Sequence, residues 1–285
     1  MVLPIIDLEA MECAARDQAE RKLADYLCDT MKPILPCMPS APEYVLPFVR
    51  VAAEHAVAAG YPDGRLFSVH VTISFLLGTR WSDDPFHAIV PRILSTPGLS
   101  LDDRLNMALS AAVRLRQELD AIQAQMHPTI IGVLTEITGD TPRLDDVWRS
   151  YRDLAHMRGI ALHQTDALWD LYVAYETDAC RLLGYAGIRR DERLNAYERL
   201  GYEHMRLRMP LPTDDYQTLD PRLRLALIQH VLLALVFGRH FRTNQLFRGL
   251  HDILAEPDQG STRSAGLRSF LNQHLRVLGE TPYGL

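Results

Sequence analysis

The sequence predicts an all-α protein, and three observations support that fold class. Apolar residues recur at helical spacing in almost every long segment, and the breaks between these segments carry Gly, Pro or Asp residues. Few connections show the alternating pattern of strands. With 285 residues, of which 47% are hydrophobic, the chain can bury a large core as one domain or as two halves.

The first expected helix covers residues 7–31, where leucines and methionines recur among charged residues as they do in an amphipathic helix. The segment 32–42 contains four prolines and cannot continue that helix. A second helix is expected over residues 47–59, and Gly60 ends it because glycine tolerates the left-handed conformation found after a helix.

Two segments of the chain resemble one another. Residues 70–97 align with residues 230–257 without a gap, at an offset of 160. We interpret the match as an internal duplication that gives two similar helical halves, residues 1–139 and 140–285, or one continuous domain. The aligned identities include His70 with His230, Gly78 with Gly238, and Pro97 with Pro257.

The alignment decides between helix and strand for segment 66–77, whose β-branched residues by themselves favour a strand. Its counterpart lacks that enrichment and follows Asp220-Pro221, a favourable pair for the start of a helix. If the two segments are related, they share a conformation, so both are predicted to be helices. Apolar residues cover their whole circumference, which marks each as the buried central helix of its half, and Gly78 and Gly238 end them.

The remaining elements are also predicted to be helices. Ser100 and Asp103 form a capping box that opens a helix reaching residue 126, and Pro128 begins a short apolar helix. Residues 138–142 separate the halves, and residues 210–219 form a polar loop. In the second half, helices are expected over residues 143–157, 162–183, 191–205, 220–237, 243–254 and 262–278.

Composition and charge exclude several classes of protein. The net charge of −6 argues against a direct nucleic-acid-binding surface, which would be basic. The N-terminus lacks the basic region of a signal peptide, and the apolar stretches are too short for a membrane span, so we expect a cytoplasmic protein without a membrane contact. The four cysteines have neither metal-binding nor disulfide spacing and are expected to be reduced, buried thiols.

No motif points to catalysis. No two histidines lie four residues apart, and the nucleophile, phosphate-binding and dinucleotide-binding motifs are missing, so we expect no enzyme activity, metal or cofactor. His70 and His230 could form a paired site, although a histidine on an apolar helix is more often part of the core. His163, Asp166 and Asp170 share one helical face, which a solvent-exposed stripe explains without chemistry.

Two acidic and aromatic loops are the candidate binding surface, because loops carry binding residues more often than helices do. Trp81 could anchor a partner or lie in the core, and Asp84 before Pro85 is also a good N-cap. Asp83, Asp214, Asp215 and Tyr216 have no evident role in capping a helix. The predicted partner-binding residues are Trp81, Asp83, Asp84, Asp214, Asp215 and Tyr216.

One stretch also suggests a family. Leu76-Leu77-Gly78-Thr79-Arg80-Trp81-Ser82-Asp83-Asp84-Pro85, followed by Ile93-Leu94 and Asp103-Arg104-Leu105, resembles a pattern in helical proteins encoded beside type VI secretion effectors and other polymorphic toxins. Such neighbours are often immunity or accessory proteins. The second copy departs from the pattern, with Thr243-Asn244-Gln245 in place of Asp-Asp-Pro, and the resemblance brings no catalytic residues.

These observations lead to the hypothesis of a cytoplasmic immunity protein that neutralises a secreted bacterial toxin by direct binding. An acidic inhibitor suits a toxin with a basic surface, such as a nuclease effector of type VI secretion, because a nuclease cleft must hold phosphates. One alternative is an adaptor or chaperone that loads an effector. Another is a helical enzyme or small-molecule binder with a pocket between the halves.

Overall fold

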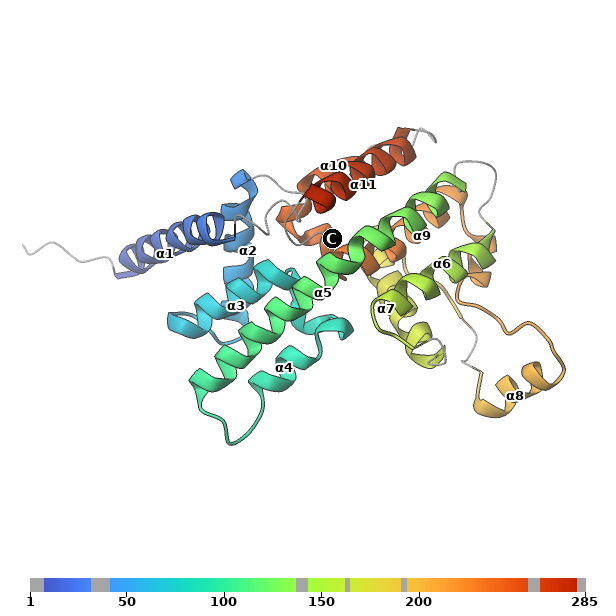
Figure 1. The fold of residues 1–285 in the computed structure, drawn as a ribbon, viewed down its shortest axis with the longest axis horizontal. Coiled ribbons are helices and arrows are strands. Elements are labelled where there is room, and N and C mark those ends of the chain that lie inside the picture. Colours follow the sequence, from blue (N-terminus) through green and yellow to red (C-terminus); the bar gives the residue numbers. More distant parts are fainter. Residues whose placement is uncertain are drawn as a thin grey trace, which may run out of the picture. The chain divides into compact units, whose positions relative to one another are not determined.

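The computed structural model describes residues 8–31, 42–136, 143–161, 165–190, 194–255 and 262–280. All regular elements in these ranges are α-helices or short 3-10 helices, which confirms the all-α prediction (Figure 1). None of the described helices is long and apolar enough to cross a membrane.

Contacts between Cα atoms divide the chain into two compact units. Unit 1 takes its described residues from 1–121, 240–255 and 273–285, and unit 2 from 122–239 and 256–272. The chain therefore leaves unit 1 and returns to it, and these boundaries do not coincide with the expected one between residues 139 and 140.

The core of unit 1 is built by α1 (Leu8–Thr30), α2 (Val45–Ala58) and α3 (Gly64–Leu77). One face of α3 packs on α2, where the rings of Phe48 and Phe75 meet edge to face at 5.9 Å. A second cluster joins residues of α3 to α4 (Ile89–Leu94) and to the first part of α5 (Leu101–Glu136). Its buried members are Ile73, Leu76, Leu77, Trp81, Val90, Ala108 and Ala112.

Helix α5 begins at the predicted capping box, since the Asp103 N–H donates to Ser100 Oγ at 3.1 Å. The prediction that Pro128 starts a separate helix is wrong, because α5 continues through it to Glu136. A proline inside a helix removes one hydrogen bond and costs about 3 kcal/mol. Met126, His127 and Ile130 are fully buried around it, and burial of several large side chains offsets that cost.

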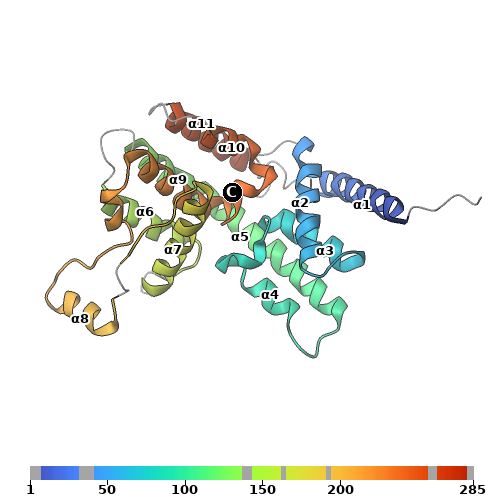
Figure 2. The same cartoon turned by 180° about the vertical axis from the view of Figure 1, so that it is seen from behind.

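The core of unit 2 is built by α6 (Leu144–Met157), α7 (Thr165–Leu182) and α9 (Pro221–Phe237), which lie together in both views (Figures 1 and 2). Twelve of the seventeen residues of α9 are buried, as predicted for a central helix. In α3 seven of fourteen residues are buried, and they lie on two sides of the helix, one packed in the cluster with α2 and the other in the cluster with α4 and α5. Other described elements include η2 (Pro42–Tyr44), α8 (Ala196–His204), η5 (Asp214–Thr218), α10 (Arg248–Ala255) and α11 (Thr262–Glu280).

The two aligned segments have the same backbone conformation after their helices. Gly78 ends α3 with φ 96° and ψ 160°, and Gly238 ends α9 with φ 91° and ψ 155°, which confirms both predicted helix ends. Two 3-10 turns follow each glycine: η3 (Trp81–Asp83) and η4 (Pro85–His87), then η6 (Phe241–Thr243) and η7 (Gln245–Phe247). Asp84 accepts the Phe86 N–H, and Asn244 accepts the Leu246 N–H, each at 3.0 Å. Asn244 therefore replaces Asp84 without loss of the cap. That the two segments arose by duplication stays a prediction.

Substitution of Gly78 by Ala should destabilise the protein by about 1–3 kcal/mol, because only glycine adopts its dihedral angles without strain. A Cβ there would meet only the Asn244 amide at 3.6 Å, so strain rather than a clash causes the loss. Gly132→Ala is the control, since its Cβ would lie in open space within α5 and should stabilise the helix by about 1 kcal/mol. Urea unfolding monitored by circular dichroism measures both changes, and a stable Gly78→Ala variant would contradict the strain argument.

Candidate partner-binding site

The structure buries the predicted anchor of the first loop. The side chain of Trp81 is 4% exposed and packs against His70, with ring centroids 5.4 Å apart. Trp81 closes the apolar cluster beneath α3, so the expectation of a surface anchor is wrong for the described conformation. Asp84 is 3% exposed and caps η4, which confirms its N-cap role and removes it from the surface.

Asp83 remains at the surface of unit 1, with its side chain 38% exposed. The guanidinium of Arg80 donates to its carboxylate at 2.6 Å, and His240 Nε2 lies 3.8 Å from the same oxygen. The negative charge that was expected to attract a partner is therefore partly neutralised by groups of the chain itself.

The second loop is also tied into the fold. Tyr216 is fully buried in η5, so it is not a surface anchor either. Asp214 accepts the Leu211 N–H at 2.7 Å and the Arg208 guanidinium at 2.8 Å, which ties its side chain to the loop that precedes η5. Asp215 lies 3.3 Å from Arg190 Nε.

Arg190 and Glu176 form a buried ion pair in unit 2. Glu176 is 2% exposed in the middle of α7, and both of its oxygens accept hydrogen bonds from the Arg190 guanidinium, one of them at 2.6 Å. Arg190 also donates to the Pro212 carbonyl at 2.7 Å and lies over the Trp169 ring at 5.8 Å. Burial alone would lower the pKa of Arg190, but the hydrogen bond and charge of Glu176 raise it.

Aromatic rings surround this ion pair. Tyr151 and Tyr172 meet edge to face at 4.9 Å, and Tyr172 lies 6.2 Å from Tyr216. Burial, followed by the negative charge of Glu176, raises the pKa of Tyr172, so its phenol stays protonated at neutral pH. Burial and then Glu176 likewise raise the pKa of the Cys180 thiol to about 11, which keeps it unreactive.

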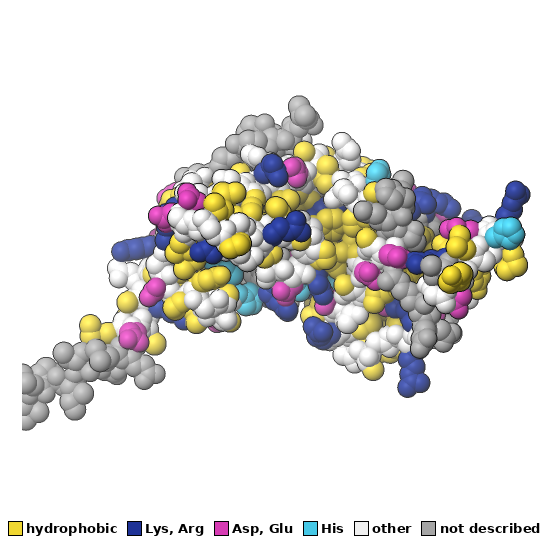
Figure 3. Space-filling view, turned by 90° about the horizontal axis from the view of Figure 1, so that it is seen from below, with side chains coloured by type: hydrophobic (Ala, Val, Ile, Leu, Met, Phe, Trp, Pro, Cys, Tyr) yellow, Lys and Arg dark blue, Asp and Glu magenta, His cyan; other side chains and the backbone are white. Residues whose placement is uncertain are grey.

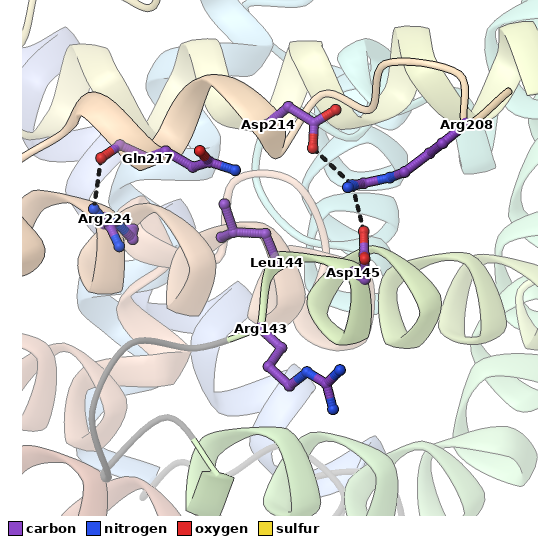
Figure 4. Close-up of a pocket in the computed structure, with 7 residues that line it drawn as sticks. All are labelled: Arg143, Leu144, Asp145, Arg208, Asp214, Gln217 and Arg224. Carbon is purple, nitrogen blue, oxygen red and sulfur yellow. Dashed lines mark hydrogen bonds and ion pairs between the residues drawn. The ribbon is translucent and has the colours of Figure 1, made fainter.

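A polar depression of about 490 Å³ lies at the start of α6 (Figure 4). The guanidinium of Arg208 lies between the carboxylates of Asp145 and Asp214 and pairs with both, while Arg143 points away from them. Arg224 is 9% exposed and donates to the Gln217 carbonyl at 3.0 Å. The charges of Asp145, Arg208 and Asp214 satisfy one another and hold the loop to α6.

The exposed apolar side chains of unit 2 are concentrated in one part of the chain. We call the described residues between α7 and η5, namely 183–190 and 194–213, the arm. In the described part of unit 2, all the large hydrophobic side chains that are exposed lie at the end of α7 or in the arm. The exposed ones are Leu182, Leu183, Tyr185, Tyr197, Leu200, Met205 and Leu207.

Helix α8 in the arm stands away from α6, α7 and α9 in both ribbon views (Figures 1 and 2). None of its described side chains is buried; Tyr197 is 87% exposed and Leu200 is 59% exposed. Figure 3 shows hydrophobic side chains at the surface at the end of the view where α8 lies. A nine-residue helix without a buried face is marginal in water, so other interactions must hold it.

Both ends of α8 are capped. Asn195 Oδ1 accepts the N–H groups of Tyr197 and Glu198, and the Glu198 carboxylate accepts the Asn195 N–H, which completes a capping box. At the other end, Arg206 takes the left-handed conformation with φ 55°, and the Leu207 N–H donates to the Tyr202 carbonyl. Capping thus supplies the stability that burial does not.

Ion pairs of two arginines fix where α8 lies. Arg199, on the side of α8 opposite Tyr197, pairs with Asp166 in the first turn of α7. Arg208, which follows the helix, pairs with Asp145 and Asp214. The sequence predicts this helix but not its exposed face. The spacing of Tyr197, Leu200 and Met205, with Gly201 and His204 between them, indicates an apolar face but does not show that it points to solvent.

The other predicted groups lie as follows. Asp166 and Asp170 are exposed, as expected for a solvated stripe, while His163 lies outside the described residues. Burial lowers the pKa of His70 to about 4, so it is neutral at neutral pH, and His230 is buried within α9. In the part of the chain that the structure describes, no three His, Cys, Asp or Glu side chains are grouped to hold a metal. Cys13 is exposed, contrary to the expectation of buried thiols, and Cys37 is outside the described residues.

Comparison with known proteins identifies no relative: no protein-family model, no curated protein and no solved structure matches the chain. The site must therefore be interpreted from its own geometry.

Replacement of Arg190 by Met should lower the free energy of unfolding by about 3–5 kcal/mol, because Glu176 would stay buried without its cation. Adding Glu176→Leu to the same chain should restore much of that loss, since no buried charge remains. Urea titration followed by near-ultraviolet circular dichroism tests both variants. An Arg190→Met variant as stable as the original protein would show that the ion pair does not stabilise this region.

Replacement of Asn195 by Ala should destabilise α8 by about 1 kcal/mol, because two N–H groups lose their acceptor. Hydrogen exchange followed by mass spectrometry should then show faster exchange across residues 197–204. Ser100→Ala is the matched control, as it removes an equivalent cap from α5 and should leave exchange in α8 unchanged. Equal exchange in α8 for both variants would contradict the role of the capping box.

Proposed function

We propose that the protein is a cytoplasmic immunity protein that neutralises a bacterial toxin by binding it directly. The observation that supports direct binding is the concentration of exposed apolar side chains between Leu182 and Leu207. Proteins rarely expose contiguous apolar surface without a use for it, and such surface often marks a site of protein interaction. Here it lies on a helix that is capped at both ends and tethered, so the surface is presented in a defined conformation.

The partner is proposed to have a basic surface. The chain carries a net charge of −6, and complementary charge speeds the encounter of two proteins and rejects wrong partners. A nuclease fits this requirement, because its cleft must attract phosphates. Together with the resemblance of segment 76–85, this favours a nuclease effector of a type VI secretion system as the toxin.

The proposal predicts a toxic partner. A tagged form of the complete chain, produced in its native host, should co-purify with a protein that stops growth when it is produced alone in the bacterial cytoplasm. Co-production of the chain should restore growth, whereas an unrelated acidic helical protein should not. A stable but harmless partner would contradict the immunity role and favour an adaptor, and the lack of any stable partner would contradict direct binding.

A further inference from the structure

Helix α8 is amphipathic, but its orientation is the reverse of that of an ordinary surface helix. At about 100° per residue, Leu200, His204, Tyr197, Gly201 and Met205 follow one another around an arc of about 140°. We call this the apolar arc; Tyr197 and Met205 in it are 87% and 62% exposed.

The opposite face of α8, which carries Arg199, is the one directed toward the rest of unit 2. Arg199 and Tyr202 lie on this face and are half-buried, whereas Tyr197, Leu200, His204 and Met205 of the arc are exposed, and Arg199 reaches Asp166. A surface helix normally turns its apolar stripe to the core and its charges to water. The tether to Asp166 keeps the apolar arc of α8 on the solvent side.

The spacing of the apolar arc matches one mode of protein recognition. Tyr197, Leu200, Gly201 and His204 stand at positions i, i+3, i+4 and i+7, the pattern by which an amphipathic helix enters a groove of its partner. Tyr is enriched among the residues that dominate binding energy, because it combines a large apolar ring with a polar end. Gly201 in the middle of the arc allows the groove wall to approach the helix backbone closely.

The charges beside the apolar arc indicate what covers it. Glu198 borders the arc on one side and Glu203 on the other, and both carboxylates are at the surface. A groove that receives this helix would place its rims against these two negative charges. Rims that carry Lys or Arg would be attracted to them, and acidic rims would be repelled.

A second copy of the chain does not fit the apolar arc. If two α8 helices packed antiparallel about Gly201, each carboxylate would lie on the same side as its own equivalent. If they packed parallel, Glu198 of one would lie on the same side as Glu203 of the other. Like charges that face each other across helices are destabilising, so self-association through α8 is disfavoured in either orientation.

We propose that α8 is a docking helix that inserts its apolar arc into an apolar groove of the partner protein, with Lys or Arg on both rims of the groove. This inference rests on the proposed function and specifies how the partner is held. The caps of α8 form the helix before the partner arrives, which lowers the conformational entropy lost on binding.

The contact can be located with a photo-reactive residue. The full-length protein carries p-benzoylphenylalanine in place of Tyr197, or in place of the control residue Met107, which is 47% exposed on α5. In the native host, position 197 should crosslink to the co-purifying partner, at peptides that line a groove with basic rims, and position 107 should not. A crosslink from position 197 to a second copy of this chain would overturn the proposal.

Affinity measured with the purified pair provides the second test. Leu200→Ala and Tyr197→Ala should each weaken binding by about thirtyfold, while Met107→Ala should leave affinity unchanged. Hydrogen exchange in α8 shows whether each variant retains the helix.

Glu203→Lys separates recognition from stability. Glu203 lies in the last turn of α8, where the helix dipole disfavours a negative charge, so Lys there should leave the helix intact or stabilise it. The same change should slow association with the partner, most clearly at low salt, because it opposes a basic rim. Glu12→Lys, an exposed reversal on α1, is the matched control.

The outcomes distinguish the two proposals. If a toxic partner binds but tolerates the changes at Leu200, Tyr197 and Glu203, the immunity role stands and the docking helix is wrong. If no partner binds the full-length protein, both proposals fail.

Discussion

Glu176 lies in the middle of α7 with 2% of its surface exposed. A carboxylate buried among aromatic rings is stable only when a cation pairs with it, because an unpaired buried charge is costly. Arg190 supplies the cation from the start of the arm, and the same guanidinium holds the Pro212 carbonyl near the arm's other end. One side chain therefore joins the two ends of the arm. This contact places η5 so that Tyr216 lies in the core beside Tyr172. The position of α8 depends on this arrangement and on the Arg199–Asp166 pair, because the chain enters and leaves α8 through the two ends of the arm.

Much of the fold follows from local patterns in the sequence. The glycines at 78 and 238, the Asp220-Pro221 pair and the Ser100 capping box mark helix ends through short-range chemistry, and the structure has all of them as predicted. The same kind of local rule predicted a helix start at Pro128, and that prediction is wrong. The helix continues through Pro128 because burial of the side chains around it stabilises it more than the lost hydrogen bond destabilises it. A local rule holds where local bonds decide the conformation, and it fails where tertiary packing contributes more.

The candidate site could be predicted only in part. Asp83, Asp214 and Asp215 were identified as acids without a capping role, yet each meets an arginine that is near in space: Arg80, Arg208 or Arg190. Tyr216 was interpreted as a surface ring because acids flank it, and Trp81 as either a surface anchor or a core residue. Both rings are buried, while Asp83 is exposed and Asp214 and Asp215 are partly exposed. Composition of a loop does not specify which side of it faces the core. In α8 the arc was visible in the sequence, but its outward orientation depends on Arg199 reaching Asp166 in another helix.

The arrangement separates the surface of α8 from the stability of the core. The pair of Arg199 with Asp166 is partly exposed, and such pairs contribute about 1 kcal/mol or less. The caps of α8 contribute a similar amount each, and neither involves the outward side chains of the arc beyond their backbone groups. Substitutions at Leu200 or Met205 should therefore change the free energy of unfolding by only about 0.5 kcal/mol, as at other exposed positions. A surface under so little structural constraint can change its side chains to follow a changing partner while the buried Glu176–Arg190 pair keeps the arm in place. In the proposed mode of binding, specificity and fold thus depend on different residues of the same unit.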